Sequence, residues 1–143
     1  MHLAPGRMAP RVVAWVFLAI SYAVPATVQA GALERKNDGG GITITALYVP
    51  ASDALEFRLT LDTHGGDLMK YDMAALTLLR VNGQGEAVAV GWKDDAKGSH
   101  HRSGVIRFAR LDPASSGALT LEIVVRGVGG VPERILRWDL AKA

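Results

Sequence analysis

The chain has 143 residues, no cysteine, and 16 basic against 14 acidic side chains. A chain without cysteine has no disulfides, no catalytic thiolate and no thiolate metal ligand. Two basic residues, Arg7 and Arg11, lie within the first 30 residues, so removal of that segment leaves 14 side chains of each sign. A neutral domain lacks the positive surface that binds phosphate backbones, and we expect no nucleic-acid partner.

Residues 1–30 have the pattern of a signal peptide. Arg7 and Arg11 precede the apolar run VVAWVFLAISYAV, and the small residues Val28 and Ala30 indicate cleavage after Ala30. The apolar run is shorter than the roughly 20 residues of a transmembrane helix. An uncleaved anchor is the alternative. We expect cleavage, a periplasmic or secreted location, and no stable membrane insertion afterwards.

The rest of the chain has the length of one domain. Residues 31–41 (GALERKNDGGG) are polar and glycine-rich, which predicts a flexible lead-in. Residues 42–143 alternate between short strand-like runs and turn signals, which predicts an all-β sandwich. The clearest run is 54–63, where alternate residues are apolar and would share one face of a sheet.

Seven strands are expected from these runs, and their number and spacing are typical of an immunoglobulin-like β-sandwich. The expected strands are 42–49, 54–63, 74–81, 86–93, 102–110, 118–126 and 134–140. Asn82-Gly83 predicts a hairpin turn. A helical turn is expected near 68–71, and Asp67 and Asp72 are expected to cap turns. Trp92 and Trp138 fall on inward phases of their strands, which favours a core role.

Three histidines lie in the expected domain, and two of them are adjacent in the segment KGSHHRSG. Imidazole nitrogens and carboxylate oxygens are common ligands of zinc and copper. Because Asp62 and His64 end one strand and His100 and His101 precede another, these four side chains are a candidate metal site at one end of the sandwich. Two alternatives stay open: a loop that the histidines stabilise by hydrogen bonds, and a pH-sensitive contact.

The run GVGGVPERILRW has many glycines, but a strand-like segment follows it where a phosphate-binding loop needs a helix. We interpret it as a tight turn. Glu133 or Arg134 is then a candidate for a surface contact, for example with Arg102 or Asp62. No serine has the sequence context of a catalytic nucleophile, so we expect no enzymatic activity.

Three segments, DTHGGDL, SHHRSGVIRF and VGGVPERILRW, together resemble a group of small exported prokaryotic proteins of unassigned activity. Those proteins carry D-T-H, H-H-R-x-G and G-V-P-E-R segments, and the resemblance covers roughly residues 42–140. It implies an immunoglobulin-like fold and a cluster of His64, His100, His101 and Arg102. It implies no reaction. The pair Gly65-Gly66 stands where a bulkier pair is expected, so that loop is expected to be looser.

Three functions are compatible with these features. The first is an exported, non-enzymatic binding module whose polar loops contact a protein partner or a small ligand, with Arg102, Glu133 and Arg134 as further contact residues. The second is a periplasmic zinc- or copper-handling protein that binds the metal as its only cofactor. The third is a structural accessory domain of an envelope assembly.

Overall fold

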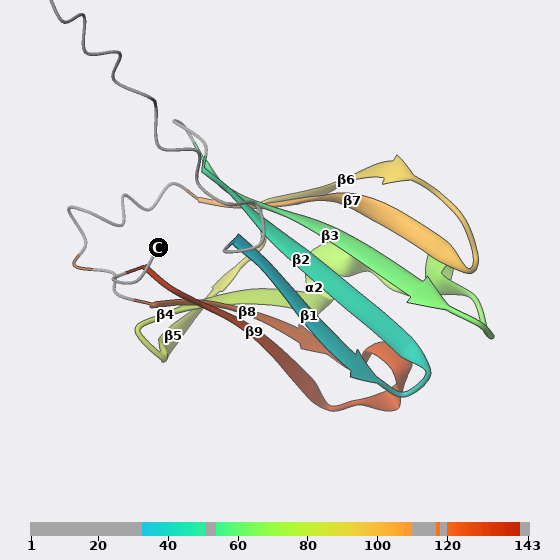
Figure 1. Cartoon of the computed structure of the whole chain (residues 1–143). Helices are drawn as coiled ribbons and strands as arrows, with labels where there is room; N and C mark the ends of the chain where they lie inside the picture. Colours follow the sequence, from blue (N-terminus) through green and yellow to red (C-terminus); the bar gives the residue numbers. More distant parts are fainter. Residues whose placement is uncertain (1–32, 51–53, 110–116, 118–119, 141–143) are drawn as a thin grey trace, which may run out of the picture.

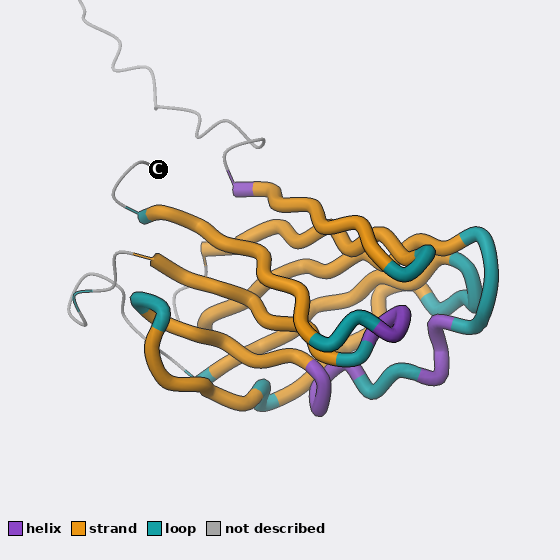
Figure 2. The backbone as a smooth tube through the Cα atoms, turned by 90° about the horizontal axis from the view of Figure 1, so that it is seen from below, coloured by secondary structure: helices purple, strands orange, loops and turns teal. Residues whose placement is uncertain are grey.

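The computed structural model describes residues 33–50, 54–109, 117 and 120–140. Within these ranges the chain forms nine strands in two antiparallel sheets and little helix. Sheet A has the order β1-β2-β3-β7-β6, and sheet B has the order β5-β4-β8-β9. Figures 1 and 2 show the two sheets facing each other, and one core cluster contains residues of both. The predicted all-β, sandwich-like structure is therefore confirmed.

The strands of sheet A are β1 (Glu34–Gly39), β2 (Ile42–Pro50), β3 (Leu55–Thr63), β6 (Gly91–Ala96) and β7 (His101–Phe108). The strands of sheet B are β4 (Thr77–Val81), β5 (Gln84–Val88), β8 (Thr120–Arg126) and β9 (Glu133–Asp139). Three short helical segments, η1 (Leu68–Lys70), α2 (Met73–Leu76) and η2 (Val128–Gly130), lie between strands. Among the described residues, no helix has the length and apolar character needed to cross a membrane.

Apolar residues at alternate positions along the strands form the core. The four apolar residues of β3 predicted to share a face (Leu55, Phe57, Leu59 and Leu61) are all buried in it. Phe57 of sheet A and Trp138 of sheet B join the two layers, with their ring centroids 5.0 Å apart. Side chains of this size contribute most to the free energy of burial, at about 25 cal/mol per Å² of apolar surface. The predicted inward position of Trp138 is confirmed, and Trp92 is half-buried against the same core.

The lead-in predicted for residues 31–41 is wrong for 34–39, which form β1. This segment has no apolar alternation, because it lies at the edge of sheet A and buries little side-chain surface. Backbone pairing with β2 holds it, in a continuous register from Glu34 opposite Leu47 to Gly39 opposite Ile42. An edge strand with polar side chains gives no period-two hydrophobic signal.

The single strand predicted for 86–93 is also wrong. Residues 84–88 form β5 of sheet B and residues 91–96 form β6 of sheet A, so the chain changes sheet between them. These two strands account for part of the difference between the nine strands observed and the seven predicted. The expected strand at 74–81 starts helically, because the Asp72 carboxylate accepts a hydrogen bond from the Ala75 N–H and caps α2. The predicted signal peptide, its cleavage site and the turn 111–117, apart from Gly117, lie outside the described residues.

Four connections meet at one end of the two sheets, which we call the loop pole. They are residues 40–41, 64–67, 97–100 and 127–132. The Thr63 N–H donates to the carbonyl of His100 at 2.9 Å, and the Leu68 N–H donates to the carbonyl of Ser99 at 2.8 Å. Figure 1 shows these connections together at the end of the molecule opposite the C-terminus.

Arg134 of β9 fixes part of the loop pole from inside. Its side chain is 1% exposed. The guanidinium donates to the carbonyls of Ile42 at 2.8 Å and Val128 at 3.0 Å, and also to that of Gly39. One buried cation therefore joins the β1–β2 turn of sheet A to the β8–β9 connection of sheet B. Burial lowers the pKa of this guanidinium from its ordinary value, because the charged form loses hydration.

Substitution of Arg134 by Met should lower the free energy of unfolding by about 2–4 kcal/mol, because it leaves buried carbonyls without donors. Arg58→Met is the control, since the Arg58 side chain is 50% exposed and pairs with Asp95 at the surface. The control should cost less than about 1 kcal/mol. Urea unfolding followed by circular dichroism measures both, and equal losses would contradict the structural role of Arg134.

Candidate functional site

Asp62 and His101, two of the four predicted metal ligands, are in contact. Register places them opposite each other on β3 and β7. The His101 Nδ1 atom lies within hydrogen-bonding distance of the Asp62 carboxylate, and the two side chains are 60% and 48% exposed. The carboxylate fixes the orientation of the ring and leaves Nε2 free of this contact. This contact involves two of the four side chains that the sequence analysis grouped at one end of the sandwich.

His64 and His100 are exposed, and each lies in a connection next to the Asp62–His101 pair. Their segments are joined through the main chain, by the hydrogen bond between Thr63 and His100. In the described part of the chain, no three His, Asp or Glu side chains form a group able to hold a metal ion. The structure thus brings two of the four predicted ligands into contact, and the zinc or copper site stays a prediction.

Arg102, predicted as a contact residue, is 5% exposed and faces the interior. Its guanidinium donates to the Asp94 carboxylate at 2.7 Å and to the carbonyls of Leu68 at 3.1 Å and Tyr71 at 2.8 Å. It also lies over the ring of Trp92, 5.5 Å from the centroid. Arg102 therefore positions η1 against sheet A, much as Arg134 positions the β1–β2 turn.

Glu133, the third predicted contact residue, belongs to a charged cluster on the outer face of sheet B. Its carboxylate accepts from Arg80 at 2.9 Å and from Arg126 at 3.2 Å, and both arginines also pair with Glu86. The hydrogen bonds from Arg80 hold the pKa of Glu133 below its usual value. The cluster satisfies Glu133 within the chain, so a partner would have to compete with these arginines.

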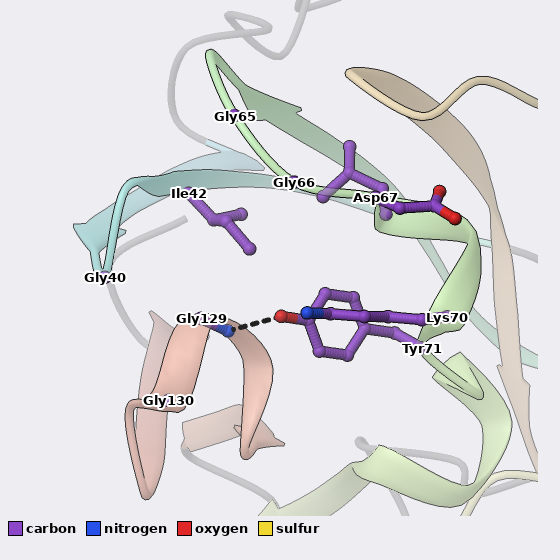
Figure 3. A pocket seen from close by; sticks show the side chains of 10 residues that line it. Gly40, Ile42, Gly65, Gly66, Asp67, Lys70, Tyr71, Gly129 and Gly130 are labelled. Atoms are coloured by element: carbon purple, nitrogen blue, oxygen red, sulfur yellow. Dashed lines mark hydrogen bonds between the residues drawn. The ribbon is translucent and has the colours of Figure 1, made fainter.

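A cavity of about 260 Å³ opens at the loop pole. It lies between the β1–β2 turn, the segment from Gly65 to η1, and the β8–β9 connection. Its lining residues are Gly40, Ile42, Gly65, Gly66, Asp67, Leu68, Lys70, Tyr71, Gly129 and Gly130. Figure 3 shows the Lys70 and Tyr71 side chains crossing the cavity towards Gly129.

Close backbone contact defines the floor of this cavity. A Cβ atom on Gly40, whose φ is +57°, would lie only 2.0 Å from the carbonyl oxygen of Gly129. The Tyr71 hydroxyl accepts a hydrogen bond from the Gly129 N–H at 3.0 Å. Arg102 holds the carbonyl of Tyr71, and Arg134 holds that of Val128, so both walls of the cavity are anchored by buried cations. The walls of the cavity are therefore held in place by contacts within the chain.

Lys70 and Tyr71 did not emerge as functional residues from the sequence. The segment DLMKYDM has no motif, and the glycines that complete the cavity lie in three connections separated by up to 90 positions (Gly40 to Gly130). The sequence feature that could have indicated the cavity is the number of glycines in those connections. From the sequence, these glycines are interpreted as turn residues. Comparisons with protein-family models, with curated proteins and with solved structures gave no match. The site is therefore interpreted from its geometry.

The Asp94–Arg102 pair should make stability depend on pH. Hydrogen bonds from Arg102, and then from Trp92, hold the pKa of Asp94 below 3.8, its value in an unfolded chain. A lowered folded-state pKa adds stability above the unfolded value and loses it as pH falls through the folded one. At pH 7, Asp94→Asn should cost about 1–3 kcal/mol, and the difference from the parent should shrink below about pH 4.

Urea titrations at several pH values measure this difference. Asp95→Asn is the control, because Asp95 pairs with Arg58 on the surface and should contribute less than about 1 kcal/mol. A cost of Asp94→Asn that stays constant from neutral to acid pH would contradict the assignment.

Proposed function

We propose that the protein is an exported, non-enzymatic binding module that takes a small ligand at the loop pole. The observation that carries the proposal is the cavity between Gly40, Tyr71 and Gly129. Ligand sites are few, concave and largely pre-formed. The cavity has these properties, since the buried guanidiniums of Arg102 and Arg134 hold its walls.

The proposal includes two finer assignments. The paired sheets and their shared core support an immunoglobulin-like sandwich, a fold that carries binding loops at its ends. The basic leader, apolar run and small residues of 1–30 support a cleaved signal peptide and a periplasmic or secreted location. On this proposal, binding takes place outside the cytoplasm. The domain has no cysteine and therefore no disulfides, so packing of its core stabilises it.

Filling the cavity should abolish binding. Gly65 and Gly91 are matched sites, because neither has a positive φ and an added Cβ meets no described atom within 4 Å at either. Gly65 lines the cavity, whereas Gly91 begins β6 away from it. Compounds of metabolite size are screened against the purified ¹⁵N-labelled protein by amide chemical shifts. Saturable shifts at the loop pole should vanish in Gly65→Phe and persist in Gly91→Phe.

Recovery of the compound chemically unchanged supports a binding module. Shifts that are equal in both variants, or that lie at the opposite end of the sheets, would refute the proposed site. Turnover of the compound would refute the non-enzymatic assignment. Absence of any saturable binding would favour an accessory domain of an envelope assembly.

A second candidate function, metal handling, rests on the contact between Asp62 and His101. Metal-binding histidines commonly present one ring nitrogen to the metal while a carboxylate holds the other. In this arrangement His101 would present Nε2, and His64 or His100 would have to move to complete the shell. Titration with Zn²⁺ followed by calorimetry should then show binding that His101→Ala weakens at least about tenfold. Equal zinc binding by the parent and this variant would exclude the site.

A further inference from the structure

The residues that line the cavity at the loop pole include one lysine, Lys70, and one aspartate, Asp67. Three of the lining residues carry hydrogen-bond donors that could serve a ligand: the Lys70 ammonium, the Tyr71 hydroxyl and the Gly66 N–H. The class of ligand that could accept from these donors follows from two observations. One is the contacts that the donors already make, and the other is the orientation of the Asp67 carboxylate.

Lys70 carries the charge. Its ammonium lies 5.1 Å from the centroid of the Tyr71 ring, and it has no carboxylate within 4 Å among the described residues. Figure 3 shows its side chain parallel to that of Tyr71, with both polar ends at the Gly129 side of the cavity. An ammonium held over an aromatic ring keeps its N–H donors available to a ligand.

Tyr71 and Gly66 supply neutral donors. The Tyr71 oxygen accepts from the Gly129 N–H at 3.0 Å, which leaves the phenolic proton available to donate. The Gly66 N–H has no acceptor within the described part of the chain, although its neighbour Gly65 donates to the Thr63 hydroxyl. Both groups lie at the cavity rather than within a strand ladder.

Among the described residues that line the cavity, Asp67 is the only acidic one, and its carboxylate makes a hydrogen bond elsewhere. Its carboxylate accepts from the Met69 N–H at 2.9 Å and caps η1. In Figure 3 this carboxylate is turned away from the ends of Lys70 and Tyr71. The ends of Lys70 and Tyr71 thus lie in the cavity while the Asp67 carboxylate faces the helical turn, so the site favours a ligand rich in acceptors.

We infer that the cavity binds a small organic anion through a carboxylate group, which accepts from Lys70, Tyr71 and Gly66. The inference rests on the proposed binding function and names its ligand class. A single lysine matches the single charge of a carboxylate better than the double charge of phosphate. A volume of about 260 Å³ is slightly smaller than the roughly 300 Å³ at which drug-sized pockets begin, which fits an anion of few atoms.

Three probes test this inference by ¹⁵N chemical-shift titration of the purified protein. Butyrate supplies one carboxylate and one negative charge, butyramide is its neutral analogue of nearly the same shape, and inorganic phosphate supplies the alternative anion. Butyrate should shift the amides of Gly66, Gly129 and Gly130 saturably, and butyramide should not. Tighter binding of phosphate than of butyrate would overturn the carboxylate assignment, as would equal binding of butyramide.

Two lysine variants locate the charge. Lys70→Gln should weaken butyrate binding at least about tenfold, the loss expected for one charge-assisted hydrogen bond. Lys93→Gln makes the same charge change on β6, outside the cavity, and should leave binding unchanged. Tyr71→Phe should weaken binding about threefold to tenfold, and melting temperatures of each variant verify that the fold is retained. Equal weakening by Lys70→Gln and Lys93→Gln would show a general charge effect and overturn the inference.

The results of these experiments distinguish failure of the carboxylate inference from failure of the proposed binding function. If none of the three probes binds but a screened compound binds at the loop pole and is excluded by Gly65→Phe, the carboxylate assignment is wrong and the binding module stands. If butyrate binds and Gly65→Phe does not affect it, both the cavity assignment and the proposed site are wrong.

Discussion

Two buried arginines determine how the loop pole is built. Arg102 and Arg134 each donate to backbone carbonyls of segments distant in the sequence, and each is almost fully enclosed. Removing such a charge from water is costly, so it persists only where several acceptors surround it. The acceptors here are carbonyls of connections, which otherwise would be the least constrained part of a β-sandwich. A rigid end on the sandwich follows from these two side chains, and the cavity depends on that rigidity.

Apolar alternation predicted the part of the fold that forms the core. The alternate apolar residues of three strands all lie on the faces that their spacing indicated: Leu55, Phe57, Leu59 and Leu61, then Ile106 and Phe108, then Leu121, Ile123 and Val125. Alternation failed where side-chain burial does not decide the structure. β1 is held by backbone pairing at a sheet edge, and the chain changes sheet at residues 89–90, where Ala89 and Val90 continue an apolar run. A local pattern records which face of a strand is buried, and it does not record the sheet to which the strand belongs.

The site was less predictable for a related reason. Asp62 and His101 could be paired because both lie at strand ends with clear alternation. Arg102 and Arg134 were expected on the surface, since arginine is seldom buried, and only the three-dimensional arrangement supplies their acceptors. Lys70 and Tyr71 lie in an irregular segment whose path is set by the Arg102 guanidinium and by the Asp67 and Asp72 caps. The residues of the cavity are therefore a product of tertiary contacts.

The enclosure of Arg134 also has a kinetic consequence. Its acceptors at Gly39 and Ile42 are more than 90 positions away along the chain, and they belong to the opposite sheet. Because closing a long loop costs chain entropy that local hairpins do not pay, we expect these contacts to form after the hairpins of each sheet. The loop pole is accordingly completed late in folding, and a partly folded chain in which β9 has not yet packed against the β1–β2 turn would lack the cavity.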